Sequence, residues 1–423
     1  MNKQESKSYA LPIAMMFALF FMIAFVTGLP SPMGVIVAKQ FGATNFESQL
    51  GFLGNFMAYA FMGIPAGIML KKWGYKVTAL SAIAVGFVGV AVQFLSGQVG
   101  LFSVYLVGTF ISGFSMCMLN TVVNPMLNTL GGGGNSGNRL LQFGGSINSI
   151  GATITPMLVG WLMGAAAGRT IEKANPALFL ALGIFALAFV VLSFVNIPEP
   201  HMETAAERKV KHSHSPLSFR HFIFGAIAIF IYVGIEIGIP STANLFMTAP
   251  TSSSNAGLGI DATLAGSIVG IYWLLMLVGR LTGASIGAKV SSKTMLIAVS
   301  SLGLVLILAA IFSPITTTVT IPFINTQVPL SIAFLVLCGL CTSIMWGGVF
   351  NLAVEGLGKY TAAAAGIFMV MVCGGGIVPL IQGWVSDHFG YINSYWVMFA
   401  CIAYMLWYAL VGCKNVNKDI PVE

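Results

Sequence analysis

Apolar residues occur along this chain in long runs separated by short polar stretches. Each run is about twenty residues long, the length that an α-helix needs to cross a hydrocarbon core of about 30 Å. The runs cover residues 11–35, 48–70, 76–96, 101–127, 140–166, 176–196, 221–247, 262–287, 293–313, 328–353, 361–385 and 391–413. Runs of this length indicate helices rather than the short strands of a barrel. The pattern predicts an all-α membrane protein with twelve transmembrane helices.

The composition excludes a soluble protein. Hydrophobic residues make up 57% of the 423 residues and charged residues only 7%, whereas a soluble domain has about 25% charged residues. The first run follows Lys3 and Lys7, as in a signal peptide, but no small-residue cleavage pattern follows it. We therefore expect it to remain as the first helix, with the lipid bilayer as the surroundings of the whole chain.

The net charge of +7 reflects the distribution of basic residues among the loops. If the N-terminus is cytoplasmic, only Lys39, Arg169 and Lys173 fall on the opposite side, and Arg280 falls inside a helix. The cytoplasmic side then holds Lys3, Lys7, Lys71, Lys72, Lys76, Arg139, Arg208, Lys209, Lys211, Arg220, Lys289, Lys293, Lys359, Lys414 and Lys418. This asymmetry predicts a multi-pass protein of the inner (plasma) membrane with both termini in the cytoplasm. The charge is topological, so no nucleic-acid partner is expected.

The chain divides into two related halves. The most polar stretch, 198–220, predicts a cytoplasmic linker between an N-terminal six-helix half (1–197) and a C-terminal six-helix half (221–423). Sequence matches at equivalent places in the two halves support a duplication. They pair Gly28-Leu-Pro30-Ser31 with Gly238-Ile-Pro240-Ser241, Asn124 with Asn351, and Pro156-Met-Leu-Val-Gly160-Trp161 with Pro379-Leu-Ile-Gln-Gly383-Trp384. Two related halves suit a transporter that works by alternating access.

Several short motifs resemble the fucose permease branch of the major facilitator superfamily, which includes glucose and galactose transporters. The motifs are Ile64-Pro65-Ala66-Gly67 with Lys71-Lys72 and Lys76, Asn124-Pro125 with Leu130-Gly131, Asn148-Ser149-x-Gly151, Gly279-Arg280-x-Thr282-Gly283, Gly374-Gly375-Gly376-Ile377-Val378 and Val385-Ser386-Asp387. The resemblance covers essentially the whole chain. It implies the major facilitator fold, with two pseudo-symmetric six-helix halves, and a sugar transporter that is commonly coupled to protons.

The chain departs from this branch at two positions. In fucose permeases an aspartate in the first helix and a glutamate in the fourth are the protonation and sugar-binding acids. The equivalent places here hold Ser31 and Asn120, and neither side chain titrates. The proton mechanism that the resemblance implies therefore cannot be transferred to these residues.

Glu236 is the one carboxylate placed deep inside a predicted span. A charged group there costs at least about 2.5 kcal/mol, so it is a candidate functional residue. We expect it to couple transport to H⁺ or Na⁺, to bind sugar hydroxyls, or to take part in a structural contact between helices. The breaks predicted at Gly238 and Pro240 would free backbone carbonyls that, with this carboxylate, suit a cation.

Amide side chains are unusually frequent within the spans. A sugar site needs amides or carboxylates for hydroxyl groups and an aromatic ring for the C–H face, so these residues predict a polar central cavity. The candidate substrate-binding residues are Asn55, Asn120, Asn124, Gln142, Asn148, Glu236, Asn244, Trp346, Asn351 and Gln382. For any single amide, a hydrogen bond between helices is an equally good interpretation.

Three charged residues near the ends of the spans are candidate gating residues. Glu355 and Asp387, with Lys359, are placed where the tenth and eleventh spans meet the cytoplasm, and Arg280 toward the cytoplasmic end of the eighth. Long cationic side chains can reach the interface from such depths and pair with acids. We expect these residues to form gating or structural ion pairs rather than substrate contacts.

No feature of the sequence indicates an enzyme, a metal or a cofactor. Cys338 and Cys341 form a C-x-x-C, but in an apolar helix rather than the accessible setting that redox chemistry needs. The glycines at 131–134 lack the Gly-Lys-Ser/Thr of a phosphate-binding loop. No disulfide is expected.

These observations together predict a monomeric secondary transporter of a neutral hexose such as glucose, galactose or fucose, with ion-coupled symport favoured over passive uniport. Two other functions stay open. A sensor that has kept the fold would need a signalling segment, and an exporter of another organic solute would need a more apolar cavity.

Overall fold

The computed structural model of the chain describes residues 9–40, 42–130, 134–162, 171–199, 214–252, 255–286, 290–321, 324–417 and 419–421. The first half contains α1 (Ala10–Gly28), α2 (Pro30–Gln40), α3 (Asn45–Ser48), α4 (Leu50–Val99), α5 (Phe102–Leu130), α6 (Gly134–Leu162), a 3-10 turn (Ile171–Ala174) and α7 (Asn175–Phe194). The predicted linker lies mostly outside the described residues, so the proposed half boundaries stay predictions.

The second half begins with a 3-10 turn (Pro216–Ser218) and continues with α8 (Arg220–Thr248), α9 (Ala262–Ile286), α10 (Ser292–Phe312), β1 (Thr318–Ile321), β2 (Thr326–Pro329), α11 (Leu330–Thr342) and α12 (Met345–Val354). A 3-10 turn (Gly358–Tyr360), α13 (Thr361–Met371), α14 (Gly374–Phe389), α15 (Tyr395–Trp407) and a π-helical turn (Tyr408–Gly412) complete it. The two strands form an antiparallel hairpin between α10 and α11, with Val319 opposite Val328.

The helices account for the twelve predicted spans. Ten helical segments among the described residues are long and apolar enough to cross a membrane. One of them, α4, is 50 residues long and covers nearly all of two predicted spans, 48–70 and 76–96. Helix α6 covers residues 140–162 of the remaining span, whose last four residues lie outside the described residues. The fold is therefore the all-α membrane architecture that the sequence predicts.

Gly74 divides α4 into its two spans. Its backbone is non-helical, with φ 85° and ψ 175°, a conformation that favours glycine because a side chain would be strained there. The carboxylate of Glu199 fills the space beside it and accepts hydrogen bonds from the backbone N–H groups of Tyr75 and Lys76. The polar turn is thereby tied to the chain that follows α7.

Large apolar side chains cover the outside of the bundle. Phe194 of α7 is 84% exposed and Phe312 of α10 is 72% exposed. Leu187 and Val305 are exposed on the same two helices. A soluble surface rarely carries so much contiguous apolar area, so these outer faces have the character of a membrane-spanning surface.

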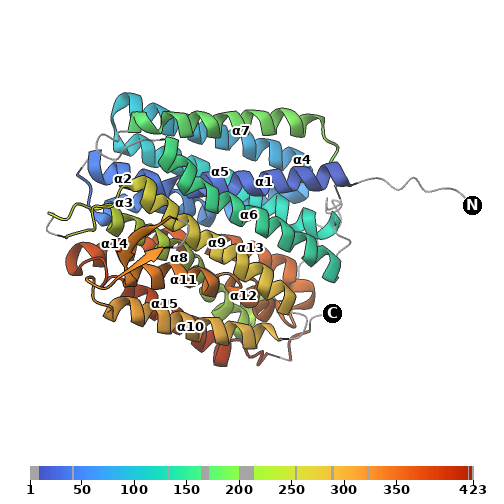
Figure 1. Cartoon of the computed structure of the whole chain (residues 1–423). Helices are drawn as coiled ribbons and strands as arrows, with labels where there is room; N and C mark the ends of the chain where they lie inside the picture. Colours follow the sequence, from blue (N-terminus) through green and yellow to red (C-terminus); the bar gives the residue numbers. More distant parts are fainter. Residues whose placement is uncertain are drawn as a thin grey trace, which may run out of the picture.

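The two halves lie side by side, with the blue to green helices on one side of Figure 1 and the yellow to red helices on the other. Helix α6 packs against α9, and α4 packs against α13 and α14. These contacts are close, because a Cβ added at Gly376 of α14 would lie 2.7 Å from the Cα of Leu53 in α4. The interface between the halves is therefore set by backbone proximity as well as by side chains.

The bundle has two distinct ends. The beginning of α1 and the end of α15 lie at one end, called the termini end here, and α2 and α3 lie at the other, the α3 end (Figure 1). The first and last described helices therefore begin and end on the same side of the bundle, as an even number of crossings requires.

The helix break predicted around Gly238 and Pro240 is absent, because α8 runs without interruption from Arg220 to Thr248. Proline has no N–H, so Pro240 leaves the carbonyl of Glu236 without its usual helical donor. The hydroxyl of Tyr272 on α9 takes that place and donates to the carbonyl at 3.3 Å. The predicted set of free carbonyls for a cation is therefore wrong at this position.

Candidate functional site

A cavity of about 570 Å³ lies between the two halves. Its volume is within the range of about 300–1,000 Å³ that is usual for small-molecule sites. Side chains from α1, α4, α5 and α6 form most of one wall, and side chains from α8, α9, α12 and α13 form most of the other. Rocking of one half against the other would open a site shared in this way to each side of the membrane in turn.

The wall from the first half carries three asparagines. Asn120 and Asn124 are four residues apart on α5 and so lie on one face of that helix. Asn148 on α6 completes the group, and all three line the cavity. Asn120 Nδ2 donates to the Tyr59 hydroxyl at 2.9 Å, and Tyr59 also lines the cavity. The polar groups of this wall are therefore uncharged, and apolar side chains such as Phe56 lie in the same wall.

The wall from the second half carries a pair of opposite charges. Glu236 on α8 and Arg280 on α9 both line the cavity, with 3.5 Å between Glu236 Oε1 and Arg280 Nη2. Their side chains are only 16% and 17% exposed. The Coulomb interaction of such a pair is strong in a low-dielectric setting, and its net charge is zero.

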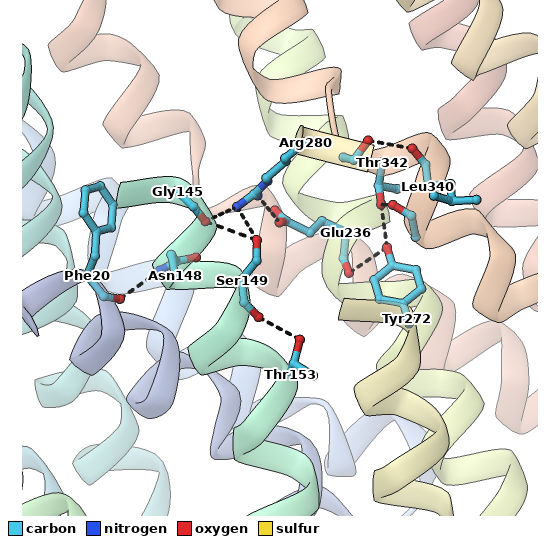
Figure 2. Close-up of polar contacts among 12 residues, drawn as sticks. Phe20, Gly145, Asn148, Ser149, Thr153, Glu236, Tyr272, Arg280, Leu340 and Thr342 are labelled. Carbon is cyan, nitrogen blue, oxygen red and sulfur yellow. Dashed lines mark hydrogen bonds and ion pairs between the residues drawn. The ribbon is translucent and has the colours of Figure 1, made fainter. Parts of the chain in front are cut away.

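Arg280 also reaches across to the first half. Its Nη1 donates to the carbonyl of Gly145 at 2.9 Å and to the hydroxyl of Ser149 at 2.8 Å, both on α6. Figure 2 shows the guanidinium between α6 and Glu236. The sequence predicts a gating residue that avoids the substrate, but the structure places Arg280 in the cavity wall, because α9 directs it inward rather than toward its own end.

Aromatic side chains line the cavity beside both polar groups. Trp346 of α12, Trp273 of α9 and Tyr59 of α4 belong to the lining. Tyr232 stands next to Trp346, with 6.1 Å between ring centroids. Tyr272 is not part of the lining, because it is buried against Thr342 and the carbonyl of Glu236.

Hydrogen bonds between the halves concentrate toward the α3 end of the cavity. Asn244 Nδ2 of α8 donates to the Ser31 hydroxyl at 3.3 Å. Gln49 Nε2, just before α4, donates to the hydroxyl of Ser241 at 3.2 Å. Ser31 and Ser241 both line the cavity. The matching positions of the two sequence repeats therefore close the cavity at this end.

Asp387 at the end of α14 joins the halves still closer to the α3 end. Its carboxylate accepts hydrogen bonds from the backbone N–H groups of Asn45 and Phe46, both at 2.8 Å. Tyr391 donates to Asn45 Oδ1 at 2.8 Å. Burial raises the pKa of Tyr391 to about 12, so this hydroxyl keeps its proton and remains a donor near neutral pH.

The predicted placement of Asp387 beside Glu355 is wrong. Glu355 follows α12, and its carbonyl contacts His221 at the beginning of α8, 3.0 Å from Nε2. Asp387 contacts the α3 end instead. The reason is that α13 and α14 cross the bundle between the two acids, so the acids lie at opposite ends. The side chain of Lys359 lies outside the described residues.

The cavity extends toward the termini end. Asn351, which lies near the end of α12, lines it and is exposed. Ser241, on the α3 side, is only 4% exposed. The cavity is therefore reached from the termini end in this conformation.

The candidate residues divide by whether they line this cavity. Those that line it are Asn120, Asn124, Asn148, Glu236, Trp346 and Asn351. Asn55, Asn244 and Gln382 are buried between helices and do not line it. The backbone of Gln142 belongs to α6, but its side chain lies outside the described residues.

Sequence reasoning missed several neighbours of the site. Tyr232 and Phe350 line the cavity, and Ser149 holds Arg280. Only one signal could have found Tyr232, which lies four residues before Glu236 and so on the same face of the helix. No sequence signal links Ser149 to Arg280, because the two are 131 positions apart.

Within the described ranges, no group of three or more His, Cys, Asp and Glu side chains could hold a metal ion. The six cysteines are all free thiols. The donors in the cavity are amides, hydroxyls and one carboxylate paired with a guanidinium.

The apolar outer surface, the paired halves and the cavity between them define a membrane transporter. Comparison with known families agrees, because the sequence model of the Major Facilitator Superfamily matches residues 15–378. The chain belongs to this superfamily, and it is a transporter rather than an enzyme.

Curated relatives extend over nearly the whole chain. A glucose/galactose transporter of Brucella abortus is 28% identical over 415 residues, which cover 97% of this chain and 96% of the relative. An L-fucose-proton symporter of Escherichia coli is 24% identical over 414 residues, covering 92% and 90%. The crystal structure of the transporter FucP in its outward conformation superposes with a TM-score of 0.66 at 21% identity, covering 97% of this chain and 100% of that one.

Proposed function

We propose that this protein is a secondary transporter that moves a neutral hexose across the membrane by alternating access, coupled to protons. The observation that carries the proposal is the composition of the cavity, in which three uncharged amides of one wall face a carboxylate and a guanidinium that neutralise each other. The two walls come from different halves, so a solute bound between them is in contact with both moving parts.

The cavity suits a neutral polyol better than an ion. A solute with a permanent charge would be attracted by one member of the Glu236–Arg280 pair and repelled by the other. A neutral hexose instead needs many hydrogen-bonding partners and an aromatic surface for its C–H face. The amides of Asn120, Asn124 and Asn148 and the ring of Trp346 offer both.

The relatives support the same substrate class. The Brucella abortus relative is named a glucose/galactose transporter and the Escherichia coli relative an L-fucose-proton symporter. Glucose, galactose and fucose are all neutral hexoses. We place this chain among hexose transporters, with glucose, galactose and fucose as the first substrates to test.

Protons are favoured as the coupling ion because of the position of Arg280. Its guanidinium lies 3.5 Å from Glu236, so the carboxylate already has a positively charged partner that would repel a Na⁺ ion bound beside it. A proton needs no separate site, since it neutralises the carboxylate by binding to it directly. When Glu236 is protonated, its ion pair with Arg280 would be lost and the guanidinium would keep only its partners on α6. When Glu236 is ionised, the ion pair would form again.

Alternating access follows from the contacts at the α3 end. In the present conformation the bonds from Asn244 to Ser31 and from Asp387 to α3 hold the halves together there. The opposite conformation has to break these bonds and bring the halves together at the termini end. A monomer is sufficient for this cycle, because both halves belong to one chain.

The proposed location is the plasma membrane, with the termini end facing the cytoplasm. The excess of lysine and arginine in the loops assigned to that side supports this orientation. A cysteine introduced at Lys414 should react with an impermeant maleimide only from the cytoplasmic side, and one at Lys173 only from outside. The unmodified protein, with its six thiols, gives the background. The reverse labelling would invert the orientation.

Transport assays in proteoliposomes test the function itself. Purified protein should exchange labelled glucose, galactose or fucose in counterflow, and an inward pH gradient should drive accumulation above the equilibrium level. A Na⁺ gradient at constant pH should not. Counterflow without accumulation under either gradient would indicate a uniporter, and no exchange of any hexose would refute the proposed substrate class.

A further inference from the structure

The three asparagines of the first-half wall share one orientation. Asn120 Nδ2 donates to the backbone carbonyl of Met116 at 3.1 Å as well as to Tyr59. Asn124 Nδ2 donates to the backbone carbonyl of Asn120 at 2.8 Å. Asn148 Nδ2 donates to the backbone carbonyl of Phe20 at 3.1 Å, as Figure 2 shows. In each residue the amide nitrogen is held against the protein.

These contacts fix which end of each amide is the nitrogen. A backbone carbonyl accepts hydrogen bonds and cannot donate them, so only the NH₂ group can lie beside it. Rotating any of the three amides by 180° would place two oxygens against each other. The ambiguity that usually surrounds amide orientation is therefore removed by chemistry at all three positions.

The amide oxygens are left facing the cavity. Among the described residues, none donates a hydrogen bond to Oδ1 of Asn120, Asn124 or Asn148. These oxygens are also absent from the buried polar atoms without a partner, a group that does include Oδ1 of Asn55 and Asn244. The oxygens of the three cavity asparagines are thus accessible to a ligand, whereas those of the two packing asparagines are enclosed.

We propose that the first-half wall is an array of acceptors that reads the hydroxyl hydrogens of the sugar, with Asn120, Asn124 and Asn148 as its specificity-determining residues. This inference rests on the proposed function and makes it more specific. Both N–H groups of Asn120 donate to protein oxygens, one to Met116 and one to Tyr59, so its side chain can only accept a hydrogen bond from a ligand. Tyr59, which accepts from Asn120, keeps its own O–H free for an oxygen of the sugar.

An acceptor array discriminates among solutes in a particular way. A hydroxyl can donate and accept, an ether or a C–F group can only accept, and a C–H group does neither. At a position read by an asparagine oxygen, replacing the hydroxyl by fluorine should therefore be as harmful as removing it. A wall of donors would behave differently, since fluorine would retain part of the contact.

The first experiment uses the unmodified protein and needs no variant. Inhibition of labelled hexose counterflow is measured with the 2-, 3-, 4- and 6-deoxy and deoxyfluoro forms of glucose and galactose. At the positions where the deoxy sugar binds most weakly, roughly tenfold below the parent as expected for an acceptor left unpaired, the fluoro sugar should be equally weak. Near-parental affinity of the fluoro sugar at every such position would overturn the acceptor array.

The second experiment assigns a hydroxyl to a residue. In Asn124→Ala the parent sugar should weaken, and at one ring position the parent and deoxy sugars should become equivalent. Asn393→Ala is the matched control, because Asn393 Nδ2 also donates to the carbonyl four residues earlier, that of Phe389 at 2.9 Å, but the residue is exposed and outside the cavity. The control should keep the parental ratio at all positions.

The outcomes separate this inference from the proposed function. If no parent hexose inhibits counterflow or is exchanged, the proposed function fails and the inference fails with it. If parent hexoses bind but Asn124→Ala, and Asn148→Ala in the same assay, leave every parent to deoxy ratio unchanged, the function stands and the acceptor array is refuted. If each variant makes the parent and deoxy sugars bind equally at one ring position, the acceptor array is supported.

Discussion

The two walls of the cavity differ in kind, although the halves that provide them are related by duplication. The wall from the first half carries, among apolar side chains, three neutral amides whose nitrogens are bonded to the protein. The wall from the second half carries an ion pair, Glu236 with Arg280, together with two indole rings. Related folds have therefore produced unlike surfaces at one site.

This difference indicates a division of work between the halves. Amides hold sugar hydroxyls without changing charge, so the first half suits recognition. A carboxylate beside a guanidinium can gain and lose a proton, so the second half suits coupling. Arg280, which bonds Gly145 and Ser149 of α6 as well as Glu236, connects the two tasks.

The largest effect is expected from Glu236→Gln. The amide can keep hydrogen bonds but cannot take up a proton, so accumulation driven by a pH gradient should fall to the equilibrium level. Counterflow should continue, because exchange needs no net proton movement. Both are measured in the same vesicles. Accumulation that survives the substitution would assign coupling to another residue.

The second effect is expected from Asn120→Ala in the opposite wall. Loss of one acceptor should raise the half-saturation concentration for sugar about tenfold, with the pH dependence of transport unchanged. Initial uptake rates over a range of sugar concentrations at two pH values measure both quantities. A variant that lost its response to pH while keeping its affinity would show that the division between the walls is wrong.

The third effect is expected from Trp346→Ala. An aromatic contact contributes about 0.5–1.5 kcal/mol, so affinity should fall roughly 2- to 10-fold. Trp346→Phe, which keeps a ring, should restore most of it. The ratio of accumulated to external sugar at saturation should not change in either variant. Equal losses in the alanine and phenylalanine variants would remove stacking as the role of this residue.

The smallest effect is expected from Ser31→Ala, where the two walls meet. The hydrogen bond from Asn244 is long, at 3.3 Å, and its loss should change sugar affinity only about twofold. Coupling to protons should stay intact. Equilibrium binding of labelled sugar by scintillation proximity is sensitive enough for this difference. A proton-coupling defect in this variant would give Ser31 a role that a hydroxyl cannot explain.

The fold was predictable because a bilayer imposes simple requirements. Runs of twenty apolar residues and the asymmetry of lysine and arginine correspond to helices and to a polar end of the bundle. Asp387 shows where this reasoning fails when it is applied to one residue. The sequence predicts that it lies with Glu355, where the tenth and eleventh spans meet the cytoplasm. The eleventh span ends at the opposite side of the bundle, and the structure places Asp387 there, at the α3 end.

The sequence predicted the types of residue that form the site better than it predicted the individual residues. Six of the ten candidate substrate-binding residues line the cavity, because a polar side chain in a span faces either the cavity or another helix. Sequence alone does not separate these two cases, and Asn55 and Gln382 belong to the second. The partnership of Arg280 with Glu236 depends on the rotation of α9 about its axis, which the apolar pattern of a lipid-embedded helix does not specify.

Sugar-dependent proton uptake tests the division between the walls most directly. Vesicles holding the protein are placed in weakly buffered medium without a gradient, and the external pH is recorded on addition of hexose. The medium should become more alkaline with the unmodified protein and with Asn120→Ala at a raised sugar concentration. With Glu236→Gln the pH should not change, although that variant still exchanges sugar. Proton uptake in Glu236→Gln, or none in the unmodified protein while it transports hexose, would contradict the division between the walls.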